Sequence, residues 1–142
     1  MPNRTRGNAA EAAVLHALVE RDLDVFVPFG GRQPYDLVVD AAGTLLRVQC
    51  KTAWPSGGCM LFNCRATDHG RGPQSYVGLA DLFGVYFPPD RAVYLVPIDA
   101  VAEHEGRLRL ESTRNNQRRR VRLAEEFAID RWKTEDLAML KR

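Results

Sequence analysis

The sequence predicts one compact domain of the α/β or α+β sandwich class. The chain has 142 residues, of which 45% are hydrophobic, and this composition suits a single domain of ordinary size. Apolar residues near the amino terminus recur at helical spacing, and later runs of β-branched and aromatic residues are short and separated by Gly and Pro. One helix followed by a meander of strands and a few short helices is typical of this class.

The first expected element is a helix that begins at Asn8 and ends near residue 21 or 22. Asn8 is of a type that caps helices, and Glu11 stands three positions later, where its side chain can return the capping bond. The apolar positions that follow lie on one helical face: Val14, Leu15, Leu18 and Val19.

A short strand and a hairpin are expected next. The strand covers residues 24–28, and the hairpin joins strands at residues 35–40 and 45–52 through a tight turn with Ala42 and Gly43 at its tip. Side chains alternate between the two faces of a strand. The second hairpin strand therefore has an apolar face with Leu46, Val48 and Cys50, and a polar face with Arg47, Gln49 and Lys51.

The remainder of the chain contains further strands with short helices between them. We expect strands at residues 59–64, 84–88, 92–97 and 107–111, the second and third of which form a hairpin. Helical segments are expected at residues 79–83, 98–103 and 134–140, and polar loops at 67–75 and 112–120. Since no linker interrupts this order, residues 1–142 are expected to form a single domain.

Composition argues against several classes of protein. No apolar run approaches the ~18 residues of a membrane span, and no apolar signal core follows the amino terminus, so a cytoplasmic protein is expected. The three cysteines include no CxxC pair, so we expect free thiols and no zinc site. His16 and His104 are interpreted as structural or solvated, and packing is favoured over base stacking for Trp54 and Tyr76.

The net charge of +2 conceals a basic arm, defined here as residues 107–122. Seven arginines and one acid occupy this arm, whereas residues 1–106 carry more acids than bases. Arginine binds phosphate or guanine, and Asn and Gln pair with adenine edges, so double-stranded DNA is the expected partner. A solvated charged loop is the alternative. The residues assigned to DNA contact are Arg47, Arg114, Asn115, Asn116, Gln117, Arg118, Arg119 and Arg120.

The hairpin brings together a carboxylate, an amide and an ammonium. With Ala42 and Gly43 at the tip, Asp36 is expected directly opposite Gln49, with Lys51 at the diagonal position. Carboxylate and carbonyl oxygens bind Mg²⁺, so the expected ligands are Asp36, the Gln49 side chain and the main-chain carbonyl of Cys50. Lys51 can orient or deprotonate the attacking water and stabilise phosphate charge. The alternative is an exposed hairpin decorated with polar residues.

Tyr35-Asp36 followed by Gln49-Cys50-Lys51, behind a helix that carries Glu11, resembles the PD-(D/E)XK nuclease superfamily. The resemblance implies an α/β fold with a central mixed β-sheet flanked by helices, and catalytic roles for Asp36, Gln49 and Lys51. Many members, including archaeal Holliday junction resolvases, add a metal-associated Glu from the first helix, and Glu11 matches that position. Capping of Asn8 is the other role open to Glu11.

Gln49 stands where Asp or Glu is usual, and this QxK pattern resembles the branch of group I intron-associated homing endonucleases. Matching stretches occur at residues 7–15, 27–30, 35–40, 46–52, 83–86, 93–97 and 115–117. The resemblance implies an active Mg²⁺-dependent endonuclease, with Mn²⁺ as a substitute and no other small-molecule cofactor. A chain of this size covers few base pairs, so a homo-oligomer, either a dimer or a tetramer, with symmetric half-sites is expected.

Three alternatives remain open at this point. A structure-selective nuclease that resembles a Holliday junction resolvase would use the same metal site. A DNA-binding module with a decayed nuclease site is the second, because an amide oxygen adds no negative charge to a metal site. A basic interaction protein with no DNA role is the third, and its binding would be indifferent to salt.

Overall fold

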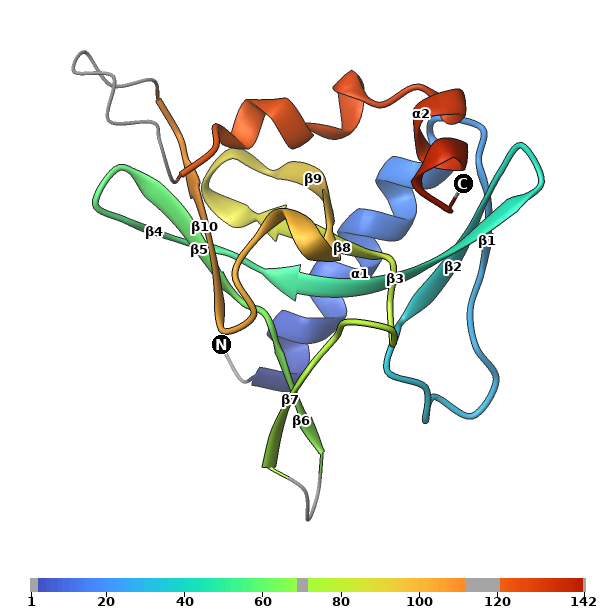
Figure 1. Ribbon diagram of the computed structural model, residues 1–142, viewed down its shortest axis with the longest axis horizontal. Coiled ribbons are helices and arrows are strands. Elements are labelled where there is room, and N and C mark those ends of the chain that lie inside the picture. The colour runs from blue at the N-terminus through green and yellow to red at the C-terminus, as the bar shows by residue number, and fades with distance from the viewer. Residues whose placement is uncertain (1–2, 69–71, 112–120, 142) are drawn as a thin grey trace.

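The computed structural model describes residues 3–68, 72–111 and 121–141, arranged as Figure 1 shows. The α-helices are α1 (Asn3–Val19) and α2 (Thr134–Ala138). The strands are β1 (Asp24–Phe26), β2 (Leu37–Ala41), β3 (Thr44–Thr52), β4 (Trp54–Ser56), β5 (Cys59–Asn63), β6 (Arg65–Asp68), β7 (Gly72–Ser75), β8 (Leu82–Phe87), β9 (Ala92–Pro97) and β10 (Glu105–Arg109). The short 3₁₀ helices are η1 (Pro88–Asp90), η2 (Ile98–Ala100), η3 (Ala124–Phe127), η4 (Ile129–Arg131) and η5 (Met139–Lys141).

A five-stranded mixed sheet in the order β1-β2-β3-β8-β9 forms the centre of the fold. Strands β3 and β8 pair in parallel, whereas the other neighbours pair antiparallel. The connection between the two parallel strands contains β4, β5, β6 and β7, so a second group of strands lies beside the central sheet. The mixed central sheet implied by the family resemblance is therefore confirmed.

The β2–β3 hairpin has the register that the sequence predicts. Leu37 pairs with Val48 at one end and Ala41 pairs with Thr44 at the other. Between the strands, Ala42 and Gly43 have φ angles of 52° and 90°. Positive φ at both central residues matches the twist of the two strands and closes the hairpin in two residues.

Helices cover one face of the central sheet. Val14 and Leu18 of α1 and Leu137 of α2 join the core on this face. Gly84 of β8 lets α1 come close, because an added Cβ there would lie 2.7 Å from Cγ1 of Val14. Near the start of the helix, the Thr52 hydroxyl donates a hydrogen bond of 3.3 Å to the carbonyl of Arg6. The helix is thus fixed across β3 and β8, and this sets the position of Glu11.

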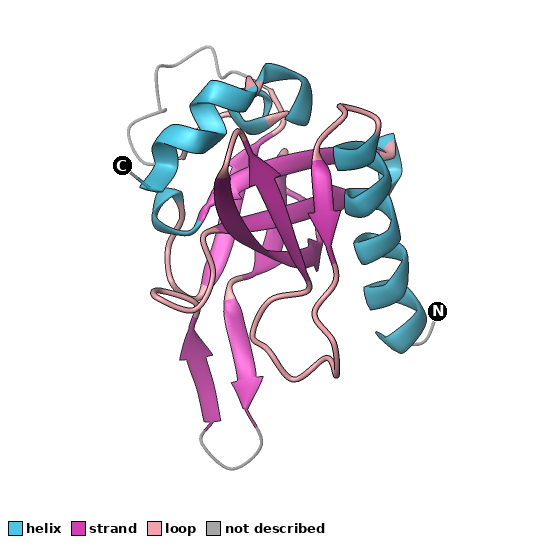
Figure 2. Ribbon diagram, turned by 90° about the vertical axis from the view of Figure 1, so that its right-hand side faces the viewer, coloured by secondary structure: helices cyan, strands magenta, loops and turns pink. Residues whose placement is uncertain are grey.

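A three-stranded sheet, in the order β10-β5-β4, lies on the other side of the molecule. It contributes Phe62 of β5 and Leu108 of β10 to a second core that also contains Phe83 of β8 and Phe127 of η3. Strands β6 and β7 form a separate hairpin that projects away from the rest of the fold, as Figure 2 shows. The central sheet therefore has helices on one face and mainly strands on the other.

Several elements differ from those expected from the sequence. Helix α1 begins at Asn3, so Asn8 lies inside the helix and the predicted cap is wrong. Residues 79–83 form no helix; the amides of Leu79 and Ala80 bond to the carbonyl of Tyr76 in a turn, and β8 begins directly afterwards. The expected loop at 67–75 contains the end of β6 and all of β7, and the expected helix at 98–103 shortens to η2. Strand β4 and the helices η3 and η4 were not expected.

The remaining predictions have mixed outcomes. All three cysteines are free and buried, as expected. Trp54 does not pack in the core, because 43% of its surface is exposed, whereas Tyr76 is 5% exposed and does. Across the described ranges, no helix has both the length and the apolar character that a membrane crossing requires. Residues 114–120, which hold most of the predicted DNA contacts, lie outside the described residues.

Candidate active site

Asp36 lies one residue before β2 and reaches across to β3. Its amide donates a hydrogen bond of 2.9 Å to the carbonyl of Val48, the pairing partner of Leu37, so two successive residues face Val48. This bond is offset by one residue from the regular register, which ends at Leu37. The Asp36 carboxylate instead accepts a 2.9 Å hydrogen bond from the amide of Cys50. Asp36 therefore lies just beyond the ladder and does not form the expected pair with Gln49.

The pKa values of the Asp36 and Glu11 carboxyls are both raised. Burial raises the pKa of Asp36, while the hydrogen bond from the Cys50 amide and the charge of Lys51 act in the opposite direction. Burial also raises the pKa of Glu11, and the negative charge of Asp36 raises it further. Repulsion between Glu11 and Asp36 means that a cation placed between them would stabilise both ionised forms.

Lys51 extends from the polar face of β3 into a shielded position. Its ammonium donates a 3.3 Å hydrogen bond to the carbonyl of Arg65 and lies 4.8 Å from the centre of the Tyr76 ring. Burial lowers the pKa of Lys51, and the neighbouring Cys64 and Asp36 oppose this effect. The side chain therefore loses water contacts but gains a carbonyl, an aromatic face and a nearby carboxylate.

Asp36 and Gln49 line a cleft of about 410 Å³. Tyr76 forms part of its wall, and the segment before β2 and the β6–β7 hairpin complete it. The remaining lining residues are Arg32, Gln33, Pro34, Ala66, Gln74 and Leu79. A polar cleft that contains a carboxylate and an amide, beside a lysine, has the groups needed to bind a phosphodiester and a metal ion.

The donor set fits Mg²⁺. Mg²⁺ usually takes one or two carboxylates and completes its shell with water and substrate phosphate. Asp36 supplies a carboxylate and Gln49 an amide oxygen to the cleft, and Glu11 of α1, which does not line the cleft, is near enough to Asp36 for the two charges to interact. In the parts of the chain that the structure describes, no three His, Cys, Asp or Glu side chains converge into a site held by protein groups alone. The arrangement therefore suits a metal ion whose coordination shell is completed by substrate and water.

The sequence profile of the PD-(D/E)XK endonuclease family matches residues 1–130. The chain belongs to the PD-(D/E)XK endonuclease family. Among solved structures, a bacterial homing endonuclease, I-Ssp6803I, matches with a TM-score of 0.74 and 24% sequence identity, over 100% of this chain and 98% of that one. At this identity the likeness concerns the fold. A comparison with curated protein sequences gave no match.

The fold of this PD-(D/E)XK endonuclease brings the predicted catalytic residues together. Asp36 and Gln49 share one cleft, and Lys51 and Glu11 are both close enough to Asp36 for their charges to interact. Glu11 cannot return a capping bond to Asn8, because both residues lie inside α1. The amide of Cys50 is engaged with Asp36, while its carbonyl remains a predicted metal ligand.

Arg47, which was assigned to DNA contact, has a different set of partners in the endonuclease. Its guanidinium donates to both carboxylate oxygens of Asp81 at 3.1 Å and to the carbonyl of Gly78 at 3.1 Å. Asp81 also accepts from the Arg47 amide at 2.7 Å and lies 3.3 Å from the ammonium of Lys141. These bonds connect β3, the start of β8 and the end of the described chain. These bonds give Arg47 structural partners, and its contact with DNA stays a prediction.

Sequence reasoning missed part of the cleft of this endonuclease. Arg32 and Gln33, in the loop before Asp36, line the cleft, and Tyr76 contacts Lys51 from the far end of the β3–β8 connection. Side chains that converge from distant segments leave no periodic pattern in the sequence. The only local signal is their polarity, which the loop shares with many solvated loops.

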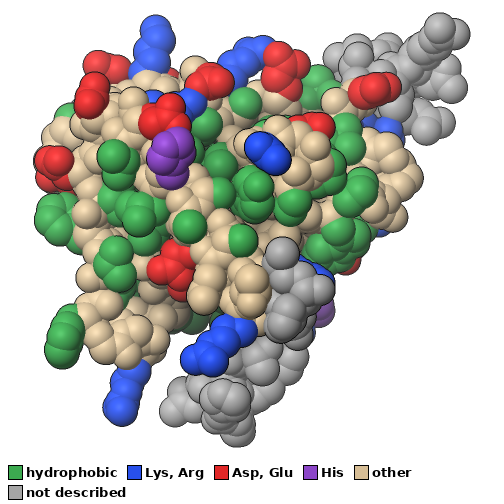
Figure 3. All heavy atoms as spheres, turned by 180° about the vertical axis from the view of Figure 1, so that it is seen from behind, with side chains coloured by type: hydrophobic (Ala, Val, Ile, Leu, Met, Phe, Trp, Pro, Cys, Tyr) green, Lys and Arg blue, Asp and Glu red, His purple; other side chains and the backbone are tan. Residues whose placement is uncertain are grey.

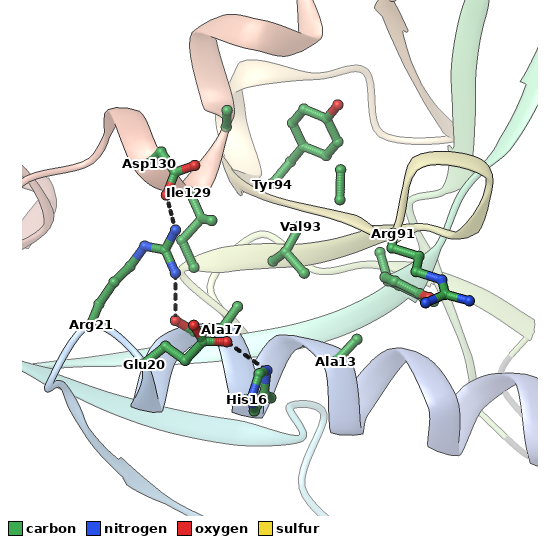
Figure 4. Close-up of a pocket in the computed structure, with 13 residues that line it drawn as sticks. Ala13, His16, Ala17, Glu20, Arg21, Arg91, Val93, Tyr94, Ile129 and Asp130 are labelled. Atoms are coloured by element: carbon green, nitrogen blue, oxygen red, sulfur yellow. Dashed lines mark hydrogen bonds and ion pairs between the residues drawn. The ribbon is translucent and has the colours of Figure 1, made fainter.

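A second hollow of about 410 Å³ lies between α1, β9 and η4 (Figure 4). Its wall includes an ion pair between Arg21 and Asp130 and a 2.9 Å contact between His16 and Glu20. None of the predicted catalytic or metal-binding residues lines it. Size alone therefore does not identify the site of chemistry in this endonuclease.

Proposed function

We propose that this endonuclease hydrolyses phosphodiester bonds of double-stranded DNA in a Mg²⁺-dependent reaction, as an enzyme of the group I intron-associated homing type. The observation that carries the proposal is the cleft in which Asp36 and Gln49 lie beside the shielded ammonium of Lys51. Family membership supports nuclease chemistry, and the similar fold of a bacterial homing endonuclease supports the homing type.

The metal-binding roles are assigned to two donors of the cleft, Asp36 and Gln49, and to two groups near Asp36. Asp36 is the main ligand, Gln49 and Glu11 are accessory ligands, and the Cys50 carbonyl completes the protein contribution. When bound, Mg²⁺ supplies Lewis acidity that polarises the scissile phosphate, and Mn²⁺ can substitute. The bond from the Cys50 amide holds the Asp36 carboxylate against β3, so its ligand position is set by the main chain of the sheet.

Lys51 acts on the attacking water and on the charge of the phosphate. Its ammonium lies beside Asp36 in a shielded position, where an electrostatic interaction is stronger than it is in open solvent. We assign it to orient or deprotonate the water and to stabilise negative charge on the phosphate. The lysine side chain suits this role because, unlike arginine, it can lose its proton.

DNA contact is assigned to residues 114–120 of the basic arm. On the face shown in Figure 3, Lys and Arg side chains of the described residues are scattered among acidic and hydrophobic ones. Arg47 is left out, since Asp81 and Gly78 occupy its guanidinium. Replacing Arg118, Arg119 and Arg120 with alanine should flatten the dependence of log K on log salt by about 0.9 per lost phosphate contact. An unchanged slope would remove the arm from the interface.

Assembly and location are further parts of the proposal. We propose that one domain, residues 1–142, carries both the cleft and the arm, and that two or four copies bind symmetric half-sites. A single chain of this size spans too few base pairs to select a long target alone. Three free, buried cysteines suit a reducing compartment, which agrees with a cytoplasmic location.

The proposal is tested by mapping cuts in genomic DNA. Genomic DNA is incubated with Mg²⁺ and the wild-type enzyme, Asp36→Asn or Lys51→Ala, and the new ends are sequenced. We expect ends that recur at one site for the wild type alone. Equal cutting by all three proteins would overturn the residue assignments. Cutting of four-way junctions without linear duplex would indicate a structure-selective nuclease, and DNA binding without any cutting would indicate a decayed site.

A further inference from the structure

Tyr76 lies at the end of the β3–β8 connection, directly against the site. It is 5% exposed, and its ring contacts Phe83 edge-on, with ring centres 5.5 Å apart and an interplanar angle of 89°. Phe83 contacts Phe62 in a similar way at 5.5 Å. The main chain of Tyr76 is fixed as well, because its carbonyl accepts hydrogen bonds from the amides of Leu79 and Ala80 at 2.9 and 3.1 Å. The position of the ring is therefore set by both packing and backbone.

The Tyr76 ring meets the ammonium of Lys51. The Nζ atom lies over the ring, 4.8 Å from its centre, while the carbonyl of Arg65 accepts its 3.3 Å hydrogen bond. An aromatic face attracts a cation through its quadrupole, most strongly where water is excluded. A lysine side chain has four rotatable bonds, so without such a partner its ammonium would sample many positions. The ring and the carbonyl together restrict the ammonium to a position against Tyr76, which lines the cleft that contains Asp36.

We propose that Tyr76 is a positioning residue, whose ring face holds the Lys51 ammonium beside Asp36 for the cleavage step. The inference rests on the proposed function, because Lys51 is the group through which Tyr76 acts. Because the aromatic ring holds the ammonium, Tyr76→Phe should keep the rate of cleavage, whereas Tyr76→Leu should lower it. The effect should be on the rate of cleavage, because Tyr76 acts on the ammonium and the basic arm supplies the DNA contacts.

The contact itself is tested by NMR of lysine-labelled protein, which needs neither metal nor DNA. The chain has three lysines, Lys51, Lys133 and Lys141, so their side-chain signals are few. We expect the Hε signal of Lys51, assigned with Lys51→Arg, to be shifted upfield by the ring. The shift should persist in Tyr76→Phe and vanish in Tyr76→Leu. A Lys51 signal at the same position in wild type and Tyr76→Leu would overturn the inference.

The catalytic consequence is tested by single-turnover cleavage with ring-fluorinated phenylalanines at position 76. Fluorination weakens the quadrupole while keeping the shape, so each added fluorine should lower the rate, and Tyr76→Leu should lose about tenfold at unchanged DNA affinity. The matched control is the same series at Tyr94, a tyrosine of the same core that is 9% exposed. Melting temperatures should stay constant within each series.

Two outcomes separate this inference from the proposed function. Undiminished cleavage by Lys51→Ala would contradict the role of Lys51 and with it the proposed mechanism. Loss of cleavage in Lys51→Ala, together with equal rates across the fluorinated Tyr76 series, would overturn the role of Tyr76 alone. A rate that falls with fluorination at Tyr76 and stays level at Tyr94 would establish that the ring acts on the ammonium.

Discussion

The carboxylate of Asp36 accepts a 2.9 Å hydrogen bond from the main-chain amide of Cys50 on the neighbouring strand. This bond ties a metal-ligand candidate to the strand that carries Gln49 and Lys51. An asparagine at position 36 can accept the same bond through its side-chain oxygen. The charge of the ligand can therefore be removed while the local geometry is kept.

Asp36→Asn should lower Mn²⁺ affinity and the cleavage rate by about 100-fold or more, because it removes the main anionic ligand. Free Mn²⁺ measured by electron paramagnetic resonance gives the affinity. Asp40→Asn is the matched control, since Asp40 lies in the same hairpin and bonds to the Gly43 amide at the turn. Equal affinity in the Asp36 and Asp40 variants would exclude Asp36 as a ligand.

Gln49→Glu should tighten Mn²⁺ binding by about tenfold, because it adds a negative charge to the donor set. Without metal, the new carboxylate should destabilise the fold through repulsion with Asp36. The measurement is the melting temperature in chelator and in Mn²⁺. The difference between these two temperatures should be larger for Gln49→Glu than for the wild type. Gln74→Glu, which changes another glutamine of the cleft, is the control. An unchanged difference would place Gln49 outside the metal shell.

Lys51→Met should lower the cleavage rate by about 100-fold or more. The same substitution should raise the free energy of unfolding by about 1 kcal/mol. Burial disfavours the charged ammonium and lowers the pKa of Lys51, and methionine removes that cost at similar volume. Chemical denaturation gives the stability and single-turnover cleavage gives the rate. Lys133→Met, at an exposed position, should change neither. A marked loss of stability in Lys51→Met would contradict this account.

Asp81→Asn should lower the free energy of unfolding by about 1–3 kcal/mol at neutral pH, because it weakens the bonds from Arg47. Burial alone would raise the pKa of Asp81, but the bonds and charge of Arg47 and the charge of Lys141 outweigh it, so the pKa is lowered.

The folded pKa of Asp81 thus lies below its unfolded value of 3.8. The contribution of ionised Asp81 to the free energy of unfolding is therefore complete above the unfolded pKa and is lost as the pH falls through the folded pKa. The wild type and Asp81→Asn should converge in stability in strong acid, as urea denaturation at several pH values will show. Lys141→Gln should cost less than about 1 kcal/mol, because that pair is more exposed.

Gly84→Ala should cost about 1–3 kcal/mol of stability through overpacking. Its Cβ would lie 2.7 Å from Cγ1 of Val14 and 3.0 Å from Cγ1 of Val48. Adding Val14→Ala should recover part of this loss, which thermal melting of the single and double variants will measure. Gly7→Ala is the control, because nothing lies within 4 Å of a Cβ at this helical position. That change should stabilise the protein by about 0.5–1 kcal/mol.

The sequence alone predicted the parts of the fold that depend on local contacts. The β2–β3 hairpin was predicted in register because a two-residue turn and a strict alternation of apolar and polar residues specify both the pairing and the faces. The motif of Asp36, Gln49 and Lys51 lies on that hairpin. For this reason the candidate catalytic residues could be placed on one hairpin from the sequence.

The remainder depended on contacts between distant segments. The offset bond of Asp36 lies at the end of the ladder, and no sequence pattern marks it. Tyr76 and Lys51 are brought together only when β8 pairs with β3. The ion pair of Arg47 with Asp81 was not predicted, because Asp81 lies far away in the chain and becomes its partner only in the fold.

The parallel pairing of β3 and β8 has a consequence for the timing of synthesis. The hairpin that carries Asp36, Gln49 and Lys51 is made early and can close locally, whereas Tyr76 and β8 leave the ribosome later. A nascent chain therefore contains the candidate metal-binding groups before it contains the Tyr76 ring that contacts Lys51. Cutting activity would appear only after the crossover is complete, which delays the nuclease until the chain has folded.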